Sequence, residues 1–441
     1  MKISNFEATG LDEVEAFLQM AAVTEATLRD ILKTCNIAFV AEGINRLQSM
    51  LLCELKASYV QQSQRYVVVA PDGYTLPMLE PQDEIKARAL MDEALALYQE
   101  MTELKEKKPG RPKTENYRYG IAIEDGRYIL PLAVKTNISV AMSGDKLLDL
   151  FRLLRDKRYQ VIFEPMRQAM LDWLPPGLGE QLMALEFLYE DVGQTEAFYQ
   201  KQLSVLSAEE PVQLFQTFEN MIVKAGLGAM TSTMSKTPSE ALADWGEAAT
   251  EKARGVAKRV MGYGHDSVIE QARATLGMRF SLVTYHQQVR HRLSSNYREN
   301  LENLIDEERQ MVVPPAIAQS VFAERFEALA NRFAAFRKMI KQKYHDGQHL
   351  YFLLNCDPVK VIIGANARIE NGMLSERICN NAQWEIRSLS VRKLGLLRQL
   401  SEELYKNALP PCVYGVCREG KLSCGRAAEM RQRYREAEQG E

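Results

Sequence analysis

The sequence has almost no net charge and no long apolar run, and both absences narrow its possible functions. Lysine and arginine number 55 against 58 aspartates and glutamates, which gives a net charge of −3. Such a chain has no global field suited to nucleic acid, so any basic site must be local. No apolar stretch approaches the roughly 20 residues that cross a bilayer, and the N-terminus lacks the apolar segment of a signal peptide. These absences predict a cytoplasmic protein whose partners are neither nucleic acid nor membrane.

Common cofactor and metal motifs are also missing. The sequence has no phosphate-binding loop, paired-glycine dinucleotide fingerprint or metalloprotease helix. Its seven cysteines are an odd number, and in a cytoplasmic chain they are expected to be thiols. Cys412, Cys417 and Cys424 could ligate Zn²⁺, but a structural site normally takes four ligands and no fourth lies nearby in the sequence. The sequence therefore predicts no metal site, with a zinc site in this tail as the weaker alternative.

The chain contains an internal repeat. Residues 31–66 and 269–303 share a short strand pattern, a helix pattern and a polar segment rich in Ser, Asn, Gln and Arg. A second set of elements follows in the same order in both halves. Each set starts with a proline that opens a long amphipathic helix pattern, and continues with an apolar strand that leads through a turn into a helix. The expected elements are strands at 36–41 and 272–280, helices at 44–55 and 281–292, long helices from Pro81 and Pro315, strand–turn–helix runs within 126–154 and 349–377, and a last helix at 382–407.

Four matching elements favour a duplication over coincidental periodicity. We therefore expect an α+β protein with two related domains, each a mixed sheet flanked by long helices. The expected domains are residues 1–175 and 211–441, and the expected helical connector is 176–210.

Arg290, His291 and Arg292 form the densest cationic cluster at an expected helix end. A helix C-terminus favours cations, so compensation of the helix dipole would explain two basic residues. Three in succession, followed by a polar run at 293–300, favour a binding site instead. Guanidinium groups bind phosphate bidentately and stack on planar rings. The cluster therefore predicts a site for a phosphorylated aromatic cofactor or a nucleotide.

Further polar residues keep a characteristic order around this cluster. They are His265, Ser267, Glu270 and Gln287 upstream, and Asn366-Ala367-Arg368, Arg377 and Ala382-Gln383-Trp384-Glu385-Ile386 downstream. This set resembles the signature of the flavin-dependent thymidylate synthases, strongly over about 255–390 and more weakly over 35–165.

The two halves keep different parts of that signature. Family members follow Arg-His-Arg with seven residues and then Ser-x-Arg-Tyr, which the second half lacks at 300–303. The first half keeps Ser63 and Arg65 of this motif. It also keeps Arg127 before a Leu-Pro strand, where the second half has Leu350, but it has no Arg-His-Arg. A duplicated gene needs only one complete set, so these complementary losses predict a working site with residues from both halves.

The resemblance implies a role for each matching residue. It implies that FAD is held by His265, Ser267, Arg290, His291, Arg292, Asn366 and Arg368. It implies that the nucleotide is held by Gln61, Ser63, Arg65, Arg127, Gln287, Arg290 and Arg377. Arg377 is the expected catalytic residue, because it would face the uracil and favour its N3-deprotonated form.

The implied reaction is the reductive methylation of dUMP to dTMP. FAD is the implied cofactor, and methylenetetrahydrofolate and NADPH are the implied co-substrates. Family members are tetramers of single domains, so a homodimer of this double chain would form a pseudo-tetramer. Gly372 and Gln61 replace an asparagine and an acidic residue of the family. Two alternatives therefore stay open: methylation of another pyrimidine nucleotide such as UMP, and a non-catalytic paralogue that binds flavin or nucleotide.

Overall fold

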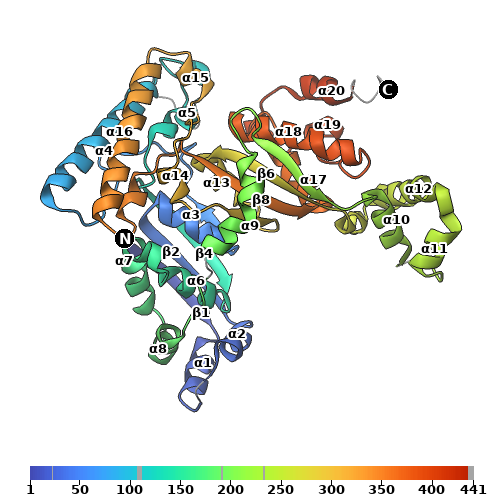
Figure 1. Cartoon of the computed structure of the whole chain (residues 1–441), viewed down its shortest axis with the longest axis horizontal. Helices are drawn as coiled ribbons and strands as arrows, with labels where there is room; N and C mark the ends of the chain where they lie inside the picture. The colour runs from blue at the N-terminus through green and yellow to red at the C-terminus, as the bar shows by residue number, and fades with distance from the viewer. Residues whose placement is uncertain (22, 107–111, 190–191, 232–233, 436–441) are drawn as a thin grey trace. The chain divides into compact units, whose positions relative to one another are not determined.

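The computed structural model describes the chain except for residues 22, 107–111, 190–191, 232–233 and 436–441 (Figure 1). It contains two four-stranded sheets, with strand orders β1-β2-β4-β3 and β5-β6-β8-β7. Counted within each sheet the two orders are identical, so the second sheet repeats the topology of the first. The expected tandem α+β fold is confirmed.

The first half, with its connector, begins with the first sheet and its helices. Its elements are β1 (Lys2–Thr9), α1 (Leu11–Leu18), α2 (Glu25–Leu32), β2 (Asn36–Asn45), α3 (Arg46–Glu54), β3 (Ser58–Gln61), α4 (Pro81–Met101), α5 (Ile123–Gly126), η2 (Arg127–Ile129), β4 (Lys135–Ser143), α6 (Lys146–Leu154), α7 (Gln160–Leu171), α8 (Pro176–Ala184) and α9 (Val192–Ser204).

The second half repeats this order, with a larger helical group, α10 to α12, between its first two strands, where the first half has α1 and α2. Its elements are β5 (Val212–Thr217), α10 (Met221–Thr231), α11 (Pro238–Trp245), α12 (Ala249–Gly262), η5 (Asp266–Gln271), β6 (Arg273–Ser281), α13 (Leu282–Gln288), β7 (Ser295–Arg298), α14 (Asn303–Asp306), α15 (Pro315–Ala318), α16 (Ala323–Lys343), η6 (Gln348–Phe352), β8 (Pro358–Asn366), α17 (Ala367–Arg377), α18 (Trp384–Leu400), α19 (Pro411–Tyr414) and α20 (Ala427–Arg435).

The first sheet is antiparallel, which corrects the expected mixed sheet. All three of its strand pairings run antiparallel, and so do β5 with β6 and β7 with β8. Thr9 at the end of β1 pairs with Asn36 at the start of β2. The α1–α2 excursion therefore leaves and re-enters the sheet at the same end, and the next strand must run in the opposite direction.

Polar N-caps convert strands into helices at equivalent places. Asn45 and Gln48 form a capping box between β2 and α3, with both hydrogen bonds at 2.8 Å. Ser281 accepts from the backbone N–H of Thr284 between β6 and α13. Asn366 caps α17 in the same way. These caps satisfy amide groups that a helix start leaves without partners, so they fix where each helix leaves its sheet.

Several expected helices are shorter than their sequence patterns. The last one, expected at 382–407, spans Trp384–Leu400. The helix expected at 281–292 ends at Gln288, so Arg-His-Arg lies in the turns beyond it. The helix expected from Pro315 is interrupted between α15 and α16, where Ser320 accepts from the backbone N–H of Phe322. A serine hydroxyl that bonds the local backbone competes with the helical pattern, and this explains the interruption.

The chain forms two compact units that do not coincide with the sequence halves. Unit 1 contains residues 1–195, 281–292 and 300–358, and unit 2 contains 196–280, 293–299 and 359–441. Helices α13 to α16 of the second half thus belong to unit 1. The expected domain limits, residues 1–175 and 211–441 with a connector at 176–210, come from the sequence repeat and remain a prediction.

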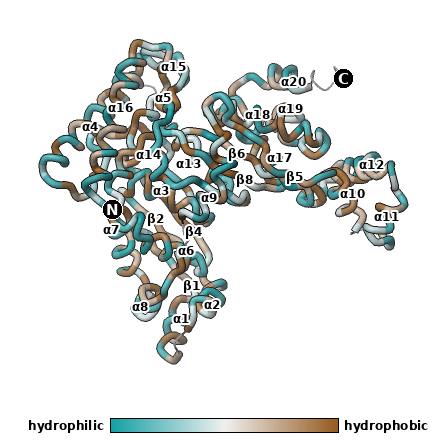
Figure 2. Tube along the Cα trace, in the orientation of Figure 1, coloured by the Kyte–Doolittle hydropathy of each residue, from teal (hydrophilic) through white to brown (hydrophobic). Residues whose placement is uncertain are grey.

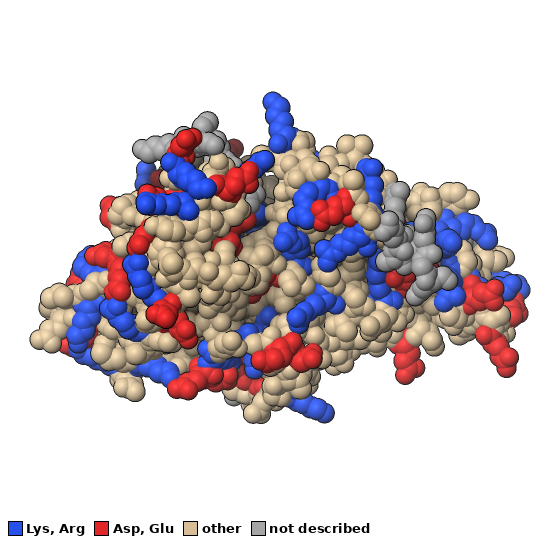
Figure 3. All heavy atoms as spheres, turned by 90° about the horizontal axis from the view of Figure 1, so that it is seen from above, with Lys and Arg blue, Asp and Glu red and all other residues tan. Residues whose placement is uncertain are grey.

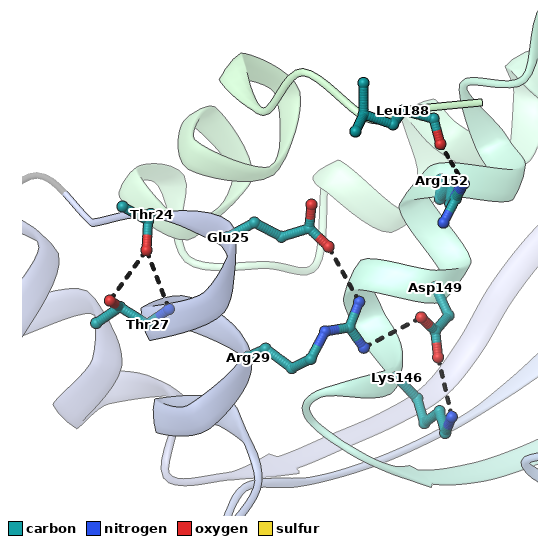
Figure 4. A network of polar contacts seen from close by, with 8 residues as sticks. All are labelled: Thr24, Glu25, Thr27, Arg29, Lys146, Asp149, Arg152 and Leu188. Atoms are coloured by element: carbon teal, nitrogen blue, oxygen red, sulfur yellow. Dashed lines mark hydrogen bonds and ion pairs between the residues drawn. The ribbon is translucent and has the colours of Figure 1, made fainter. Parts of the chain in front are cut away.

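Unit 1 joins equivalent elements of the two halves. The amphipathic helices α4 and α16 pack together (Figures 1 and 2), and an ion pair of 2.7 Å links Lys343 to Asp83. The segments that precede β4 and β8 also pair, with a backbone hydrogen bond of 2.7 Å from Leu132 to Leu353. Within the first half, Arg29 donates to Glu25 and Asp149 and so links α2 to α6 (Figure 4).

Unit 2 contains the second sheet, the group α10 to α12 and helices α17 and α18. Helices α10 and α12 approach so closely at Gly226 that a Cβ atom there would lie 2.6 Å from Ala253 Cα. A buried ion pair of 2.7 Å between Lys393 and Glu370 joins α18 to α17. No helix in the described part of the chain is long and apolar enough to cross a bilayer.

Candidate active site

Gln61 lies at one of the places in unit 1 where the two halves meet. It ends β3, and its Nε2 lies 2.5 Å from Nε2 of His286 on α13. The same amide nitrogen donates to Cys53 Sγ at 2.6 Å and to Ser49 Oγ at 3.2 Å, both on α3. A strand and a helix of the first half are thereby joined to a helix of the second half.

His286 is buried and neutral. Burial lowers the pKa of His286 well below its usual value, and the positive charges of Arg46, Arg290 and Arg127 lower this pKa further. A neutral imidazole has one acceptor nitrogen. Because the Gln61 amide nitrogen can only donate, this contact is a hydrogen bond in the tautomer whose proton lies on Nδ1 of His286, with Nε2 as the acceptor.

Arg292 of the Arg-His-Arg motif lies against the first half. Its guanidinium donates to Ser58 Oγ and to the backbone carbonyl of Tyr59, both at 3.3 Å, and lies 6.0 Å from the centre of the Tyr59 ring. Nearby, the Tyr285 hydroxyl donates to Glu54 at 2.6 Å. Arg292 of the second half therefore contacts strand β3 of the first half.

Arg65 and Arg127 converge on Glu124. The Arg65 guanidinium forms an ion pair of 2.6 Å with the Glu124 carboxylate, and Arg127 Nε donates to the Glu124 backbone carbonyl at 3.1 Å. Arg127 is only 4% exposed, and its Nη2 has no hydrogen-bond partner among the described residues. Burial lowers the pKa of Arg127. Arg127 begins the 3-10 helix η2 rather than preceding a strand directly, and its backbone carbonyl accepts from Asn355 of the second half.

Arg46 belongs to the same cluster, although sequence reasoning missed it. It is the first residue of α3 and is 5% exposed. Burial, and after it the charge of Arg127, lowers the pKa of Arg46 to about 9. The available signal was an arginine at the start of the largely apolar helix that carries Met50, Leu51 and Leu52.

Cys53 lies in the core, as expected. Burial raises the pKa of its thiol to about 12, although Arg46, Arg290 and Arg292 act in the opposite direction. The thiol is therefore neutral at physiological pH and contributes no negative charge to the cluster.

The remaining nucleotide-side residues lie on the surface of unit 1. Ser63 and Arg65 share a turn in which the Arg65 amide donates to Ser63 Oγ at 3.2 Å. This loop and residues 135–137 of β4 line an open pocket of about 370 Å³. Gln287 donates to the backbone carbonyl of Val283, and Arg290 is exposed.

Unit 2 brings together four of the residues assigned to the flavin. Helix α17 packs on η5, which carries Ser267 and follows His265, and both residues are exposed. Asn366 caps α17, and Arg368 forms an exposed ion pair of 2.6 Å with Glu270. Histidine, serine and arginine on an exposed surface suit the pyrophosphate of a dinucleotide. Arg377 ends the same helix nine residues later, about 14 Å further along its axis.

A fourth cysteine of unit 2, Cys379, lies near the cysteine tail although it is distant from the tail in the sequence. Asn381 donates to the backbone carbonyl of Leu422 at 2.8 Å and brings the Cys379 segment to the tail. Burial raises the pKa of Cys379 and of Cys412, and the other tail cysteines act in the same direction. Across the described ranges, no group of three metal-ligating side chains is arranged to hold an ion.

The donor set of unit 1 fits an anionic ligand. Arg46 and Arg127 are buried and each carries an N–H group without a partner among the described residues, and the neighbouring His286 and Cys53 are neutral. Elsewhere acidic and basic side chains are interspersed, as the face drawn in Figure 3 shows. The cluster is thus a local basic site on a chain with little net charge.

Comparison with known proteins gives consistent matches. The model of a family described as thymidylate synthase complementing protein matches residues 7–175 and 214–401. The chain is 32% identical over 205 residues to the flavin-dependent thymidylate synthase of Clostridium tetani, covering 42% of this chain and 82% of that protein. It is 32% identical over 187 residues to the corresponding protein of Geobacter sulfurreducens, covering 40% and 79%. For that of Nitratidesulfovibrio vulgaris the identity is 30% over 194 residues, covering 41% and 79%. Each relative covers less than half of this chain, as a duplication predicts.

Proposed function

Because this chain belongs to the thymidylate synthase complementing protein family, we propose that it is a flavin-dependent thymidylate synthase that methylates dUMP to dTMP. The proposal includes FAD as cofactor, with methylenetetrahydrofolate and NADPH as co-substrates. The observation that carries it is the meeting of first-half and second-half residues in unit 1. Gln61 contacts His286, and Arg292 contacts Ser58 and Tyr59.

In this proposal the nucleotide is held by the basic cluster of unit 1. Arg65 and Arg127 bind its phosphate, with Ser63 as a further hydrogen-bond donor. Glu124 supports this assignment, because it holds Arg65 by its carboxylate and Arg127 by its carbonyl. Two guanidinium groups fixed in this way need little reordering when a ligand arrives. Gln287 and Arg290 complete the nucleotide side.

The flavin side is proposed from the family resemblance together with the donor types. Bound FAD would supply the reducing chemistry of the reaction. By the resemblance, Arg290, His291 and Arg292 would bind FAD. The same resemblance assigns His265, Ser267, Asn366 and Arg368 to FAD, and their grouping at η5 and the start of α17 supports this role.

Arg377 is the proposed catalytic residue. A guanidinium that faces the uracil would stabilise negative charge at N3 and raise electron density at C5. Stabilising charge that develops in the transition state is usually a large catalytic term. Arg377 needs no proton transfer for this role, since arginine stays charged at physiological pH.

Gln61 favours one alternative substrate. Its amide is held by three side chains within the protein, and it replaces an acidic residue of the family. A contact with the nucleotide sugar made by that acid would be absent here. We therefore include UMP, which carries a 2′-hydroxyl, as a second candidate.

Purification followed by visible absorption and assay tests the proposal. We expect the protein to bind FAD and to form a methylated nucleotide from dUMP, methylenetetrahydrofolate and NADPH. UMP in place of dUMP decides between the two substrates. A protein that binds FAD and nucleotide but forms no product with either would be the non-catalytic paralogue. A colourless protein that also fails to bind added FAD would contradict the flavin assignment.

A further inference from the structure

Arg46 is a buried charge that only one half of the chain carries. It follows the cap Asn45, and its backbone N–H donates to Val134. In the second half, Leu282 follows the cap Ser281 and donates to Asp357 in the same way. Leu282 is 1% exposed and Arg46 is 5% exposed. The fold therefore accepts an apolar side chain at the equivalent buried position.

No acidic group balances Arg46 within the described part of the chain. It forms no ion pair there, and its Nε has no hydrogen-bond partner. The groups that act on it are the cation Arg127 and the neutral thiol of Cys53. An uncompensated buried charge destabilises a folded protein. The presence of this buried charge therefore suggests that a bound ligand supplies the balancing negative charge.

We propose that Arg46 is a ligand-binding residue of this site, and that it receives, together with Arg127, the phosphate of the bound nucleotide. Both guanidinium groups are nine-tenths buried or more, and both have an N–H without a partner. A guanidinium binds phosphate oxygens bidentately. The identity of the ligand rests on the proposed function, whereas the need for an anion rests on the geometry alone.

The charge of the cluster favours a phosphate monoester over a carboxylate. Among the described residues neither Arg46 nor Arg127 forms an ion pair, although the charges of Glu124 and Asp125 act on Arg127, and the Glu124 carboxylate itself pairs with Arg65. A monocarboxylate would neutralise one of the two. A phosphate monoester, which carries nearly two negative charges at neutral pH, would neutralise both.

Arg46→Leu tests the proposal, because it copies the second-half residue. We expect the unliganded variant to unfold at the same temperature as the wild type or higher. Its affinity for dUMP should fall about 10- to 100-fold in titration calorimetry. Its affinity for deoxyuridine, which lacks the phosphate, should not change. Arg332→Leu is the matched control, since Arg332 is an exposed arginine of α16 that pairs with Glu93, and it should leave both affinities unchanged.

Thermal shifts with dUMP and with inorganic phosphate separate the possible failures. If the wild type and Arg46→Leu bind dUMP equally, the inference is wrong and the proposed function stands. If neither dUMP nor UMP binds but phosphate stabilises the wild type and not Arg46→Leu, the anion site stands and the proposed function is wrong. If neither ligand stabilises the wild type, both are wrong. If Arg46→Leu and Arg46→Gln both fail to fold, Arg46 serves the fold and the inference is wrong.

Discussion

At the scale of single residues, the site depends on which groups are charged. Arg46 and Arg127 are buried cations, whereas His286 and Cys53 beside them are neutral. A protonated His286 would add a third positive charge and would lose its acceptor nitrogen for Gln61. The contact between Gln61 and His286 therefore depends on a neutral imidazole.

This dependence predicts a pH effect on stability. The pKa of His286 is lowered in the folded state, so between that pKa and about 6.5 the unfolded chain binds the extra proton. Stability conferred by the neutral ring is therefore full above about pH 6.5 and is lost as the pH falls, by up to about 1.4 kcal/mol per pH unit. Denaturant unfolding of wild type and His286→Gln between pH 5 and 7.5 measures it. The facing groups Arg46 and Cys53 have pKa values of about 9 and about 12, outside this range, so equal slopes in both proteins would contradict the prediction.

The sequence predicted some of these residues and could not predict others. Arg65 and Arg127 belong to motifs that can be recognised in the linear chain, and the structure places them together at Glu124. Arg46 and His286 belong to no such motif. Gln61 and His286 are separated by 225 positions in the sequence. The contacts that indicate a role for His286 therefore form only in the folded chain.

At the scale of elements, the pairing of α4 with α16 joins the two halves. Its ion pairs differ in exposure. Asp83 is buried and accepts from Lys343 at 2.7 Å and from the Tyr344 hydroxyl at 2.9 Å, whereas Arg332 and Glu93 form an exposed pair. Buried hydrogen-bonded carboxylates contribute more to stability than exposed ion pairs do.

Asp83→Asn should therefore destabilise the protein by about 1–3 kcal/mol at pH 7. Glu93→Gln, the matched exposed control, should change stability by less than about 0.5 kcal/mol. The hydrogen bond from Lys343 lowers the pKa of Asp83, so its contribution is present above the unfolded pKa and is lost as the pH falls through the folded one. Urea unfolding at pH 7 and pH 3 measures both effects. Equal losses in the two variants at pH 7 would show that burial does not decide the strength of this pairing.

Element starts were easier to predict than element ends. Pro81 begins α4, as expected from its place ahead of an amphipathic pattern. The end of α13 at Gln288 was not predicted, because apolar spacing continues beyond it while Arg292 makes its contacts with β3 instead. Tertiary contacts therefore decided where the helix stops.

At the scale of the whole molecule, the repeat predicted two copies of one fold, and the two sheets confirm it. Their association could not be predicted, because a sequence repeat carries no information about which surfaces of its copies meet. Unit 1 contains the first half together with α13 to α16 of the second. This arrangement explains the complementary loss of motif residues. Unit 1 contains Arg-His-Arg of the second half together with Ser63, Arg65 and Arg127 of the first half.

The central claim is that residues from both halves of the same chain form one nucleotide site. Arg127 and Arg290 both act on His286 within unit 1. Arg127→Leu and Arg290→Ala chains carrying different affinity tags should each be inactive. The measurement is the thymidylate synthase activity of the co-expressed pair after purification on both tags in succession, which retains only mixed assemblies. We predict no recovery, because no chain keeps both arginines. Recovery of activity in the confirmed mixed assemblies would contradict the claim and would show that each site joins two different chains.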